Sequence, residues 1–213
     1  MIQSIRSALE QEVARFQLWA GDYGQRQFSE WECDYPDWAS LYTAVSEFIA
    51  DSKIMDWDES VIGLLIYAIA RDNEDEYLAP LLQADVEKLQ VLATAAVHSE
   101  EKDAKWQLGE QLAFCADRLA SAESLLLAFA ADDDEYVRRR SMMALGRMKS
   151  GHVESLAKAA WETGDEHQRM AALDALYNVQ SEQFETYVKM AHADGRQYLV
   201  ASADRLSSSP RLK

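Results

Sequence analysis

Apolar residues recur along most of the chain at the spacing of an α-helix. In "ASAESLLLAFAA" (120–131), Leu125, Leu126 and Phe129 fall on one face, at positions i, i+1 and i+4. A second helical pattern follows directly, over residues 134–148. Only eight Gly and three Pro interrupt the 213 residues, too few for a β-sandwich or a doubly wound α/β fold. The pattern therefore predicts an all-α protein.

Short connections separate the expected helices. These helices are 2–20, 36–51, 59–71, 74–83, 85–98, 103–115, 120–131, 134–148, 152–163, 166–178, 181–192 and 195–206. Short links favour antiparallel pairs, and stacked pairs give a right-handed superhelix. The predicted fold class is therefore a right-handed α-solenoid of antiparallel helical pairs.

The chain repeats itself at a constant step. "ESLLLAFAADDDEYVRRRSMMALGRM" begins at Glu123 and "ESLAKAAWETGDEHQRMAALDALYNV" begins at Glu154, with nine of 26 positions identical and no gap. The same step joins Asp134 to Asp165, and going backwards it joins Asp134 to Asp103 and Asp72. A fixed period of about 31 residues indicates stacked supersecondary units.

The acidic block "DDDE" (132–135) stands before three arginines, 138–140. Acidic side chains suit the positive end of a helix dipole, and a short Asp can accept a backbone N–H bond there. Neither a calcium loop nor a phosphate loop matches the pattern, because the required glycines are missing. We interpret the block as a turn followed by a helix start.

The repeat resembles the short HEAT-like repeats known from phycobilisome lyases. Their second helix runs Asp-x-x-Val-Arg-x-x-Ala-x-x-Ala-Leu. Here the matching positions are Asp134, Val137, Arg138, Ser141, Ala144 and Leu145, then Asp165, Gln168, Arg169, Ala172, Ala175 and Leu176. The resemblance implies that Asp134, Arg138, Asp165 and Arg169 form a structural ladder between neighbouring repeats.

The resemblance is clear over about 120–179 and weakens towards both ends. We expect one α-solenoid domain over 1–213. Its parts are a divergent acidic half, 1–84, the HEAT-like repeats, 85–206, and a frayed tail, 207–213.

Charge is concentrated in the first half. Residues 30–103 contain 18 Asp or Glu and 4 Lys or Arg, a net charge of −14 out of −16 for the whole chain. Such a surface repels nucleic acid, whose binding depends on Lys and Arg, and attracts basic proteins. We therefore expect a basic protein as partner and neither nucleic acid nor a membrane.

Signatures of catalysis and of cofactors are missing. The four His fit no common zinc spacing, no Gly-rich phosphate loop occurs, and no local Ser–His or Cys–His motif is present. No apolar run reaches the roughly 20 residues that cross a bilayer, and the N-terminus does not resemble a signal peptide. We expect no cofactor, no metal, no enzyme activity, two free thiols at Cys33 and Cys115, and a cytoplasmic location.

Two acidic stretches are the candidate partner-binding sites. The first, "EWECDYPDW" (30–38), interleaves acids with aromatic residues, a composition common in interface hot spots. Its acids are Glu30, Glu32, Asp34 and Asp37, and Trp38 is included with them. Trp31, Tyr35 and Trp38 have an alternative role as the cap of the solenoid core.

The second candidate combines "MDWDES" (55–60) with "RDNEDEY" (71–77). Its acids are Asp56, Asp58, Glu59, Asp72, Glu74, Asp75 and Glu76. If the helix starts line up on one edge, these acids form a single negative rim with Glu100 and Glu101. The alternative is that they only solvate loops and cap helices. "VRRRS" (137–141) is a third candidate, for anions, through Arg139 and Arg140.

The acidic half also resembles the small helical immunity proteins that neutralise bacterial toxins. The resemblance covers mainly 28–80, in "WECDYP-x-W" and "LLIYAIARDNE". It implies tight one-to-one binding of a basic toxin domain, such as a nuclease, with carboxylates blocking its cleft. Two alternatives stay open: a general HEAT-like scaffold for another protein, and a bilin-lyase-like enzyme. DNA glycosylases of similar fold are disfavoured because their grooves are basic.

Overall fold

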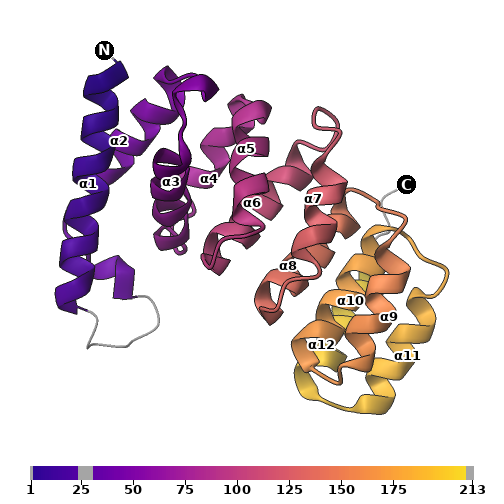
Figure 1. The fold of residues 1–213 in the computed structure, drawn as a ribbon. Coiled ribbons are helices and arrows are strands. Elements are labelled where there is room, and N and C mark those ends of the chain that lie inside the picture. The colour runs from indigo at the N-terminus through magenta and orange to yellow at the C-terminus, as the bar shows by residue number, and fades with distance from the viewer. Residues whose placement is uncertain (1, 24–30, 210–213) are drawn as a thin grey trace. The chain divides into compact units, whose positions relative to one another are not determined.

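The computed structural model describes residues 2–23 and 31–209, and their regular secondary structure consists of helices (Figure 1). Helices that follow one another in the chain pack together, as expected for HEAT-like helical pairs. The predicted all-α fold class is confirmed. Among the described helices, none combines the length and apolarity needed to cross a membrane.

The chain divides into two compact units, Met1–Gln111 and Leu112–Lys213, with the division inside α6 (Lys102–Phe114). Each unit buries its own apolar side chains. The boundary expected after residue 84 concerned where the repeats begin in the sequence. The division at residue 111 concerns which residues pack together, so the two boundaries describe different things. The single-domain organisation stays a prediction.

The C-terminal unit is built from three helical pairs. They are α7 (Ala122–Phe129) with α8 (Glu135–Arg147), α9 (Val153–Glu162) with α10 (Glu166–Asn178), and α11 (Phe184–Asp194) with α12 (Gln197–Ser208). First helices begin at 122, 153 and 184 and second helices at 135, 166 and 197. In both series the helix starts are 31 residues apart, which is the period seen in the sequence.

Aspartates begin two of the three second helices of this unit, α8 and α10, whereas Arg196 precedes α12 without a side-chain cap. The Asp134 carboxylate accepts from the backbone N–H of Val137 at 3.1 Å, and Asp165 accepts from that of Gln168 at 2.9 Å. Each bond satisfies an amide that has no partner within its own helix. The interpretation of "DDDE" as a turn and a helix start is confirmed by this geometry.

A second polar contact repeats at the same step. Ser150 donates its hydroxyl to Glu123 at 2.5 Å, and Ser181 donates to Glu154 at 2.6 Å. Each serine directly follows a residue with positive φ, 59° at Lys149 and 56° at Gln180. The left-handed residue ends the second helix of one pair, and the Ser–Glu bond ties that end to the start of its first helix.

The predicted ladder residues hold the repeats in two ways. Arg138 donates to the backbone carbonyls of Asp132 and Asp133, at 2.8 and 2.7 Å, and so fixes the turn before its own helix. Arg169 bonds the Asp194 carboxylate, at the end of α11 in the next pair. Only the second of these two arginine contacts links neighbouring repeats.

Links between neighbouring second helices also come from side chains outside the four predicted ladder residues. Gln168 donates its amide to the Glu135 carboxylate at 3.0 Å, and Glu166 accepts from the backbone N–H of Leu199 at 3.1 Å. Gly146 allows a close approach of the same helices, because a Cβ atom there would lie 2.8 Å from the Ala175 Cα.

The N-terminal unit is less regular. Its helices are α1 (Ile2–Tyr23), α2 (Trp38–Asp51), α3 (Glu59–Arg71), α4 (Leu78–Leu81), α5 (Val86–Ala96) and most of α6, with 3₁₀ turns at Trp31–Asp34, Ile54–Asp56 and Leu82–Ala84. The repeat step leads to Asp72, but here the residue follows α3 instead of opening a second helix.

The helix expected over 74–83 is wrong for its first half. Residues 72–77 form a turn region, Glu76 has a φ of 50°, and only the single turn of α4 follows. Asp72 explains the difference, because its side chain accepts from the backbone N–H of Leu78 at 2.7 Å and so marks the entry to α4.

An aromatic cluster holds α1 against α2 and α3. The buried Phe16 ring lies at its centre, with centroids 4.7 Å from Tyr35, 5.3 Å from Trp38 and 6.1 Å from Tyr67. The tilted and edge-on geometries are those that aromatic pairs favour. The cluster thereby fixes the segment 31–38 on the body of the unit.

Candidate functional site

The structure brings together two acidic segments that lie far apart in the chain. Segments 31–38 and 71–77 meet around a pocket of about 180 Å³. We call it the acid–aromatic pocket. Its lining residues are Glu32, Cys33, Trp38, Tyr42, Arg71, Asp72, Asn73, Glu74 and Asp75. The lining contains four carboxyl groups and one guanidinium, so acidic groups outnumber basic ones.

Asp72 is the structural hub of the pocket. It is 1% exposed, and its carboxylate accepts from the Tyr42 hydroxyl at 2.6 Å as well as from the backbone of α4. Burial raises the pKa of Asp72, and the bonds from Tyr42 and the α4 backbone partly oppose that rise. Asp72 was predicted as part of an exposed rim, but its burial makes it a support for the pocket wall.

Arg71 carries the positive charge of the pocket. Its guanidinium lies 3.7 Å from the Glu32 carboxylate, bonds Glu101, and lies 5.1 Å from the centroid of the Tyr67 ring. Its Nε is buried and has no hydrogen-bond acceptor within residues 2–23 and 31–209. Burial raises the pKa of Glu32, against the opposing charge of Arg71. Arg71 is therefore engaged by two of the unit's own acids.

The rim of the pocket carries the carboxylates that solvent reaches. Glu74 and Asp75 are exposed, and Asp75 lies 3.3 Å from the Tyr42 hydroxyl. Glu76, next in the chain, is half-buried and has a left-handed backbone. Glu74 and Asp75 are therefore the predicted acids of segment 71–77 that a partner reaches most directly.

The residues predicted in 30–38 fall into several classes. Glu30 lies outside the described residues, as does the side chain of Trp31. Tyr35 is buried, at 4% exposed, in the Phe16 cluster, which fits the role as core cap. Trp38 is half-buried and lines the pocket, while its indole N–H donates to the Glu32 carbonyl at 2.8 Å.

Three acids of this segment differ in exposure. Glu32 is 5% exposed and belongs to the pocket wall, whereas Asp34 and Asp37 are exposed. Asp37 precedes α2 without a side-chain bond to that helix. The segment thus supplies one acid to the pocket wall, Glu32, and two exposed acids that do not line the pocket.

The acids of 55–60 do not share a rim with those of 71–77. The first group precedes α3 and the second follows it, so the 13 residues of α3 separate them by roughly 20 Å. The single-rim prediction is therefore wrong. Glu101 does lie with the second group, through its bond to Arg71.

Acids at the start of α3 have local structural bonds. Asp58 accepts from the Val61 N–H at 3.0 Å and pairs with Arg6 at 2.8 Å, and these bonds lower the pKa of Asp58. Asp56 accepts from the Lys53 N–H at 2.9 Å. Glu59 is exposed in the first turn of α3.

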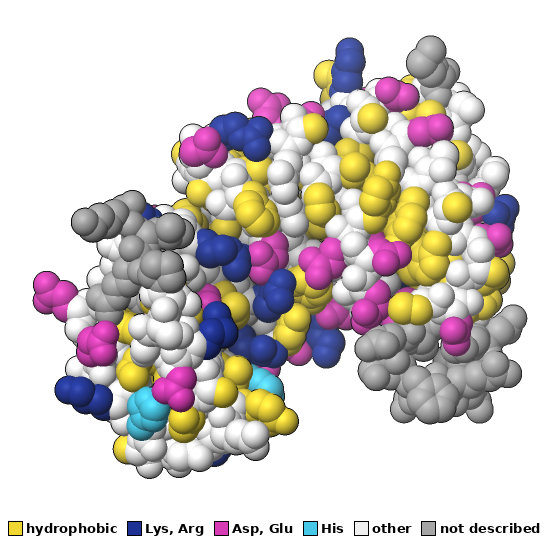
Figure 2. Space-filling view, turned by 180° about the vertical axis from the view of Figure 1, so that it is seen from behind, with side chains coloured by type: hydrophobic (Ala, Val, Ile, Leu, Met, Phe, Trp, Pro, Cys, Tyr) yellow, Lys and Arg dark blue, Asp and Glu magenta, His cyan; other side chains and the backbone are white. Residues whose placement is uncertain are grey.

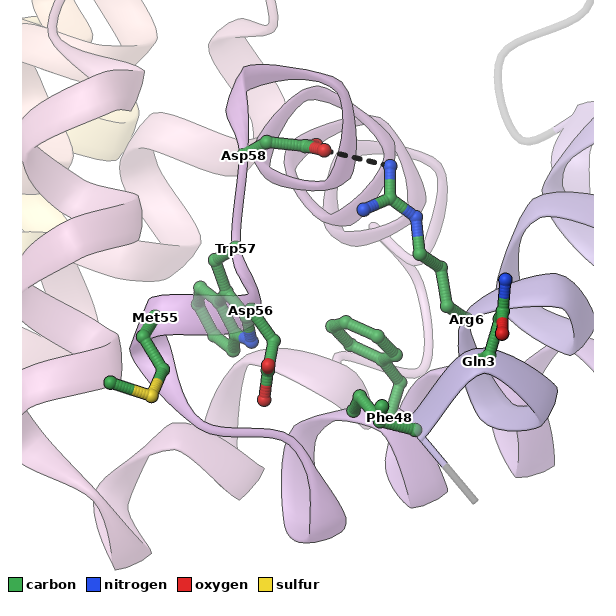
Figure 3. A pocket seen from close by; sticks show the side chains of 8 residues that line it. Gln3, Arg6, Phe48, Met55, Asp56, Trp57 and Asp58 are labelled. Atoms are coloured by element: carbon green, nitrogen blue, oxygen red, sulfur yellow. Dashed lines mark ion pairs between the residues drawn. The ribbon is translucent and has the colours of Figure 1, made fainter.

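Figure 3 shows a second pocket at this end of the unit, of about 540 Å³. Phe48 and Trp57 provide buried apolar walls, and Arg6 from α1 reaches across to Asp58. Met55 on its edge is 85% exposed. This pocket carries fewer acids than the acid–aromatic pocket, and its one arginine is already paired with one of them.

Charge differs sharply between the units. Residues 1–111 contain 22 Asp or Glu and 8 Lys or Arg, whereas residues 112–213 contain 15 and 13. Figure 2 shows acidic side chains lying among apolar ones on one face of the N-terminal unit. The excess of negative charge therefore belongs to the unit that holds the acid–aromatic pocket.

The basic stretch 137–141 is engaged within the C-terminal unit. Arg139 pairs with Glu135 at 3.0 Å, and the Arg139 and Arg140 guanidinium carbons lie 4.6 and 5.7 Å from the centroid of the Tyr136 ring. The guanidinium groups of Arg139 and Arg140 thus already contact groups of their own helix. This makes the third candidate, an anion site at these two arginines, less favourable.

Metal chemistry has no arrangement to support it within residues 2–23 and 31–209. No group of three or more His, Cys, Asp or Glu side chains there is placed to hold a metal ion. The carboxylates of the acid–aromatic pocket thus differ in geometry from a cation cage. Neither cysteine forms a disulfide within the described part of the chain, as expected, and Cys33 is exposed whereas Cys115 is buried.

Sequence reasoning missed Cys33, Tyr42, Arg71 and Asn73 as pocket residues. Tyr42 had a usable signal, since it lies four positions after Trp38 and so on the same face of α2. Their ring centroids are 5.0 Å apart. Arg71 and Asn73 had none, because their positions depend on how α3 ends.

A comparison with protein families matches residues 122–204 to HEAT repeats. The match covers the three helical pairs of the C-terminal unit almost completely, and it supports a HEAT-like helical repeat protein. No curated protein and no solved structure matches the chain. HEAT-like repeats suggest a scaffold for protein interaction, without indicating the partner.

Proposed function

We propose that the protein is a non-enzymatic binding protein whose N-terminal unit captures a basic protein. The observation that carries this proposal is the convergence of two distant acidic segments on one pocket with aromatic walls. A charged rim around aromatic side chains is a common composition of binding hot spots. The C-terminal repeats act as the scaffold of the chain.

Charge supports the choice of a basic partner. The N-terminal unit has 14 more acids than bases, and such a field accelerates encounter with a positively charged protein. Aromatic side chains that become buried in the complex slow its dissociation. Nucleic acid is disfavoured by the same charge.

The finer form of the proposal is an immunity protein that neutralises a toxin. Nuclease domains expose basic clefts that bind nucleic acid, and an acidic inhibitor blocks such a cleft by binding in its place. Such an inhibitor acts where the nucleic acid is, so the proposed location is the cytoplasm. This step rests on the charge and on the resemblance of segment 28–80.

Affinity capture from the source cell with the full chain as bait tests the proposal. The variant E74K/D75K reverses the two exposed rim acids of the pocket. The matched control E47K/D51K makes the same charge change at exposed positions of α2. The second substitution of that control puts a positive charge at a helix C-terminus, where it is tolerated.

We expect a basic protein to bind the wild-type chain and the control, and to bind E74K/D75K about 100-fold more weakly. A toxin nuclease whose activity is inhibited by the chain supports the finer form. Equal loss in both variants reduces the interaction to general charge attraction. Capture of only neutral or acidic proteins contradicts the proposal.

A further inference from the structure

The acid–aromatic pocket has the size of one side chain. Its volume of about 180 Å³ is below the roughly 300 to 1,000 Å³ of sites for small organic ligands. The two segments that form it come from different parts of the unit and are held by the buried Asp72 and the Phe16 cluster. It is therefore a formed receptor for a group of limited size.

Most hydrogen-bond donors around this pocket are engaged by the protein itself, one exception being the buried Arg71 Nε, which has no acceptor among the described residues. The Trp38 indole donates to the Glu32 carbonyl, the Tyr42 hydroxyl donates to Asp72, and Arg71 pairs with Glu32 and Glu101. These bonds leave their donor groups with partners inside the unit. A ligand that needs many donors from the protein, such as a phosphate or a carboxylate, is poorly matched.

Oxygen acceptors, in contrast, dominate what the pocket offers. Glu74 and Asp75 are exposed at the rim. The side-chain carbonyl oxygen of Asn73 is buried and has no hydrogen-bond partner among the described residues. An arginine side chain carries five N–H donors and no acceptor, so its hydrogen-bonding pattern is the complement of this lining.

Aromatic rings add a face for a flat cation. Trp38 and Tyr42 lie with centroids 5.0 Å apart and an interplanar angle of 30°, and the Tyr77 ring continues the row at 4.9 Å from Tyr42. Tyr77 is 49% exposed. A guanidinium stacks on such rings and bonds carboxylates in its plane at the same time, which an ammonium does less well.

We propose that the acid–aromatic pocket receives one arginine side chain of the basic partner. The guanidinium stacks on the ring pair Trp38–Tyr42, and its N–H groups donate in their plane to the carboxylates of Glu74 and Asp75. This inference rests on the proposed function, since it names the group by which the partner is anchored. A free metal ion is a poorer occupant, because no described cluster has metal-binding geometry.

Titration of the full chain with capped tripeptides of the form Gly-X-Gly tests the anchor without the partner. X is arginine, lysine or citrulline, the last being the neutral isostere of arginine. The indole ¹H–¹⁵N signal of Trp38, assigned with W38F, reports on the pocket directly. We expect the arginine peptide to shift this signal with an affinity of roughly 1 mM, as for a small ligand. Lysine binds more weakly, and citrulline does not shift the signal.

The isosteric variant E74Q/D75N separates the pocket from the rest of the acidic surface. It should weaken binding of the arginine peptide about tenfold, since each partly exposed charge contributes roughly threefold. The control E47Q/D51N should stay within about twofold, as expected for distant screened charges. An unchanged melting temperature in both variants shows that the fold is intact.

Equal shifts with arginine and citrulline, no shift at all, or full binding by E74Q/D75N would overturn the inference. These results are distinguishable from failure of the proposed function, which concerns capture of a basic protein. If the chain captures a basic protein but does not bind the arginine peptide, the proposed function is supported and the arginine anchor is wrong.

Discussion

The two units use polar side chains for different ends. In the C-terminal unit the same contacts recur from one repeat to the next, with Ser150–Glu123 repeated as Ser181–Glu154. In the N-terminal unit the residue in phase with these repeats, Asp72, is buried and builds the wall of a pocket. Where the N-terminal unit departs from the repeat, the position that caps a second helix elsewhere, occupied here by Asp72, supports a pocket instead.

The largest expected effect concerns what holds each unit together. Replacing Phe16 by Ala removes the centre of the aromatic cluster and should lower the free energy of unfolding of the N-terminal unit by about 3–5 kcal/mol. Leu18, on the same helix, is 74% exposed. L18A should change the free energy of unfolding by less than about 0.5 kcal/mol. Urea denaturation followed by tryptophan fluorescence measures both. A similar cost for both variants contradicts the assigned role of Phe16.

A glycine pair sharpens the comparison between the units. In G146A the new Cβ meets the Ala175 backbone, so we expect a loss of about 1–3 kcal/mol in the C-terminal unit. Gly63 in α3 has no atom within 4 Å of the equivalent Cβ position. G63A should therefore stabilise the N-terminal unit by about 0.5–1 kcal/mol, the difference in helix propensity. Thermal denaturation of the two variants gives the signs, and equal signs disprove the close approach of α8 and α10.

The repeated serines predict equal effects at equivalent positions. S150A and S181A each remove a hydroxyl bonded to a glutamate, at a cost of about 1 kcal/mol. The paired variants E123Q and E154Q keep the size of the acceptor and act as controls. Clearly different losses in the free energy of unfolding for S150A and S181A would contradict this prediction. They would show that the two repeats share a backbone geometry but differ in how much the Ser–Glu bond stabilises them.

Sequence patterns predicted the C-terminal unit well because its helices obey one period and two of its three second helices begin at an aspartate cap. The start of α8 at Glu135 follows from Asp134, whose side chain binds the amides that the helix leaves open. No period or cap pattern in the sequence predicted the pocket. Its walls come from residues 38, 42 and 72, and only the folded unit brings them together.

The sequence also misjudged which acids are accessible. Glu32 and Asp72 have the same side-chain chemistry as Glu74 and Asp75, yet the first two are buried and the last two exposed. Burial depends on the Tyr42 and Arg71 contacts, which no local pattern encodes. The sequence therefore named five of the nine lining residues as candidates, whereas which of the acids are buried and which are exposed required coordinates.

The smallest expected effect is a difference in pH dependence. Burial raises the pKa of Asp72 above 3.8, so between 3.8 and the raised pKa the native state keeps a proton that the unfolded chain has released. Its contribution to the free energy of unfolding is therefore greatest below 3.8 and decreases as the pH rises through the raised pKa. Asp194 is the opposite case, because Arg196 and Arg169 lower its pKa below 3.8. Its contribution is present above 3.8 and is lost as the pH falls through the lowered pKa.

Urea denaturation of D72N and D194N between about pH 7 and about pH 3 measures this contrast. The stability of the wild-type chain relative to D72N should increase as the pH falls. Relative to D194N it should decrease at the acidic end. The same trend in both variants contradicts the assignment of the buried and the ion-paired carboxyl group.

Hydrogen exchange of the full chain, free and bound to the basic protein that it captures, tests the central claim most directly. The account predicts new protection of backbone amides in segments 31–42 and 71–78, around the acid–aromatic pocket. Amides of α8, α10 and α12 should exchange as in the free protein. Protection confined to those three helices, with segments 31–42 and 71–78 unchanged, would show that the partner binds the repeats and would contradict the account.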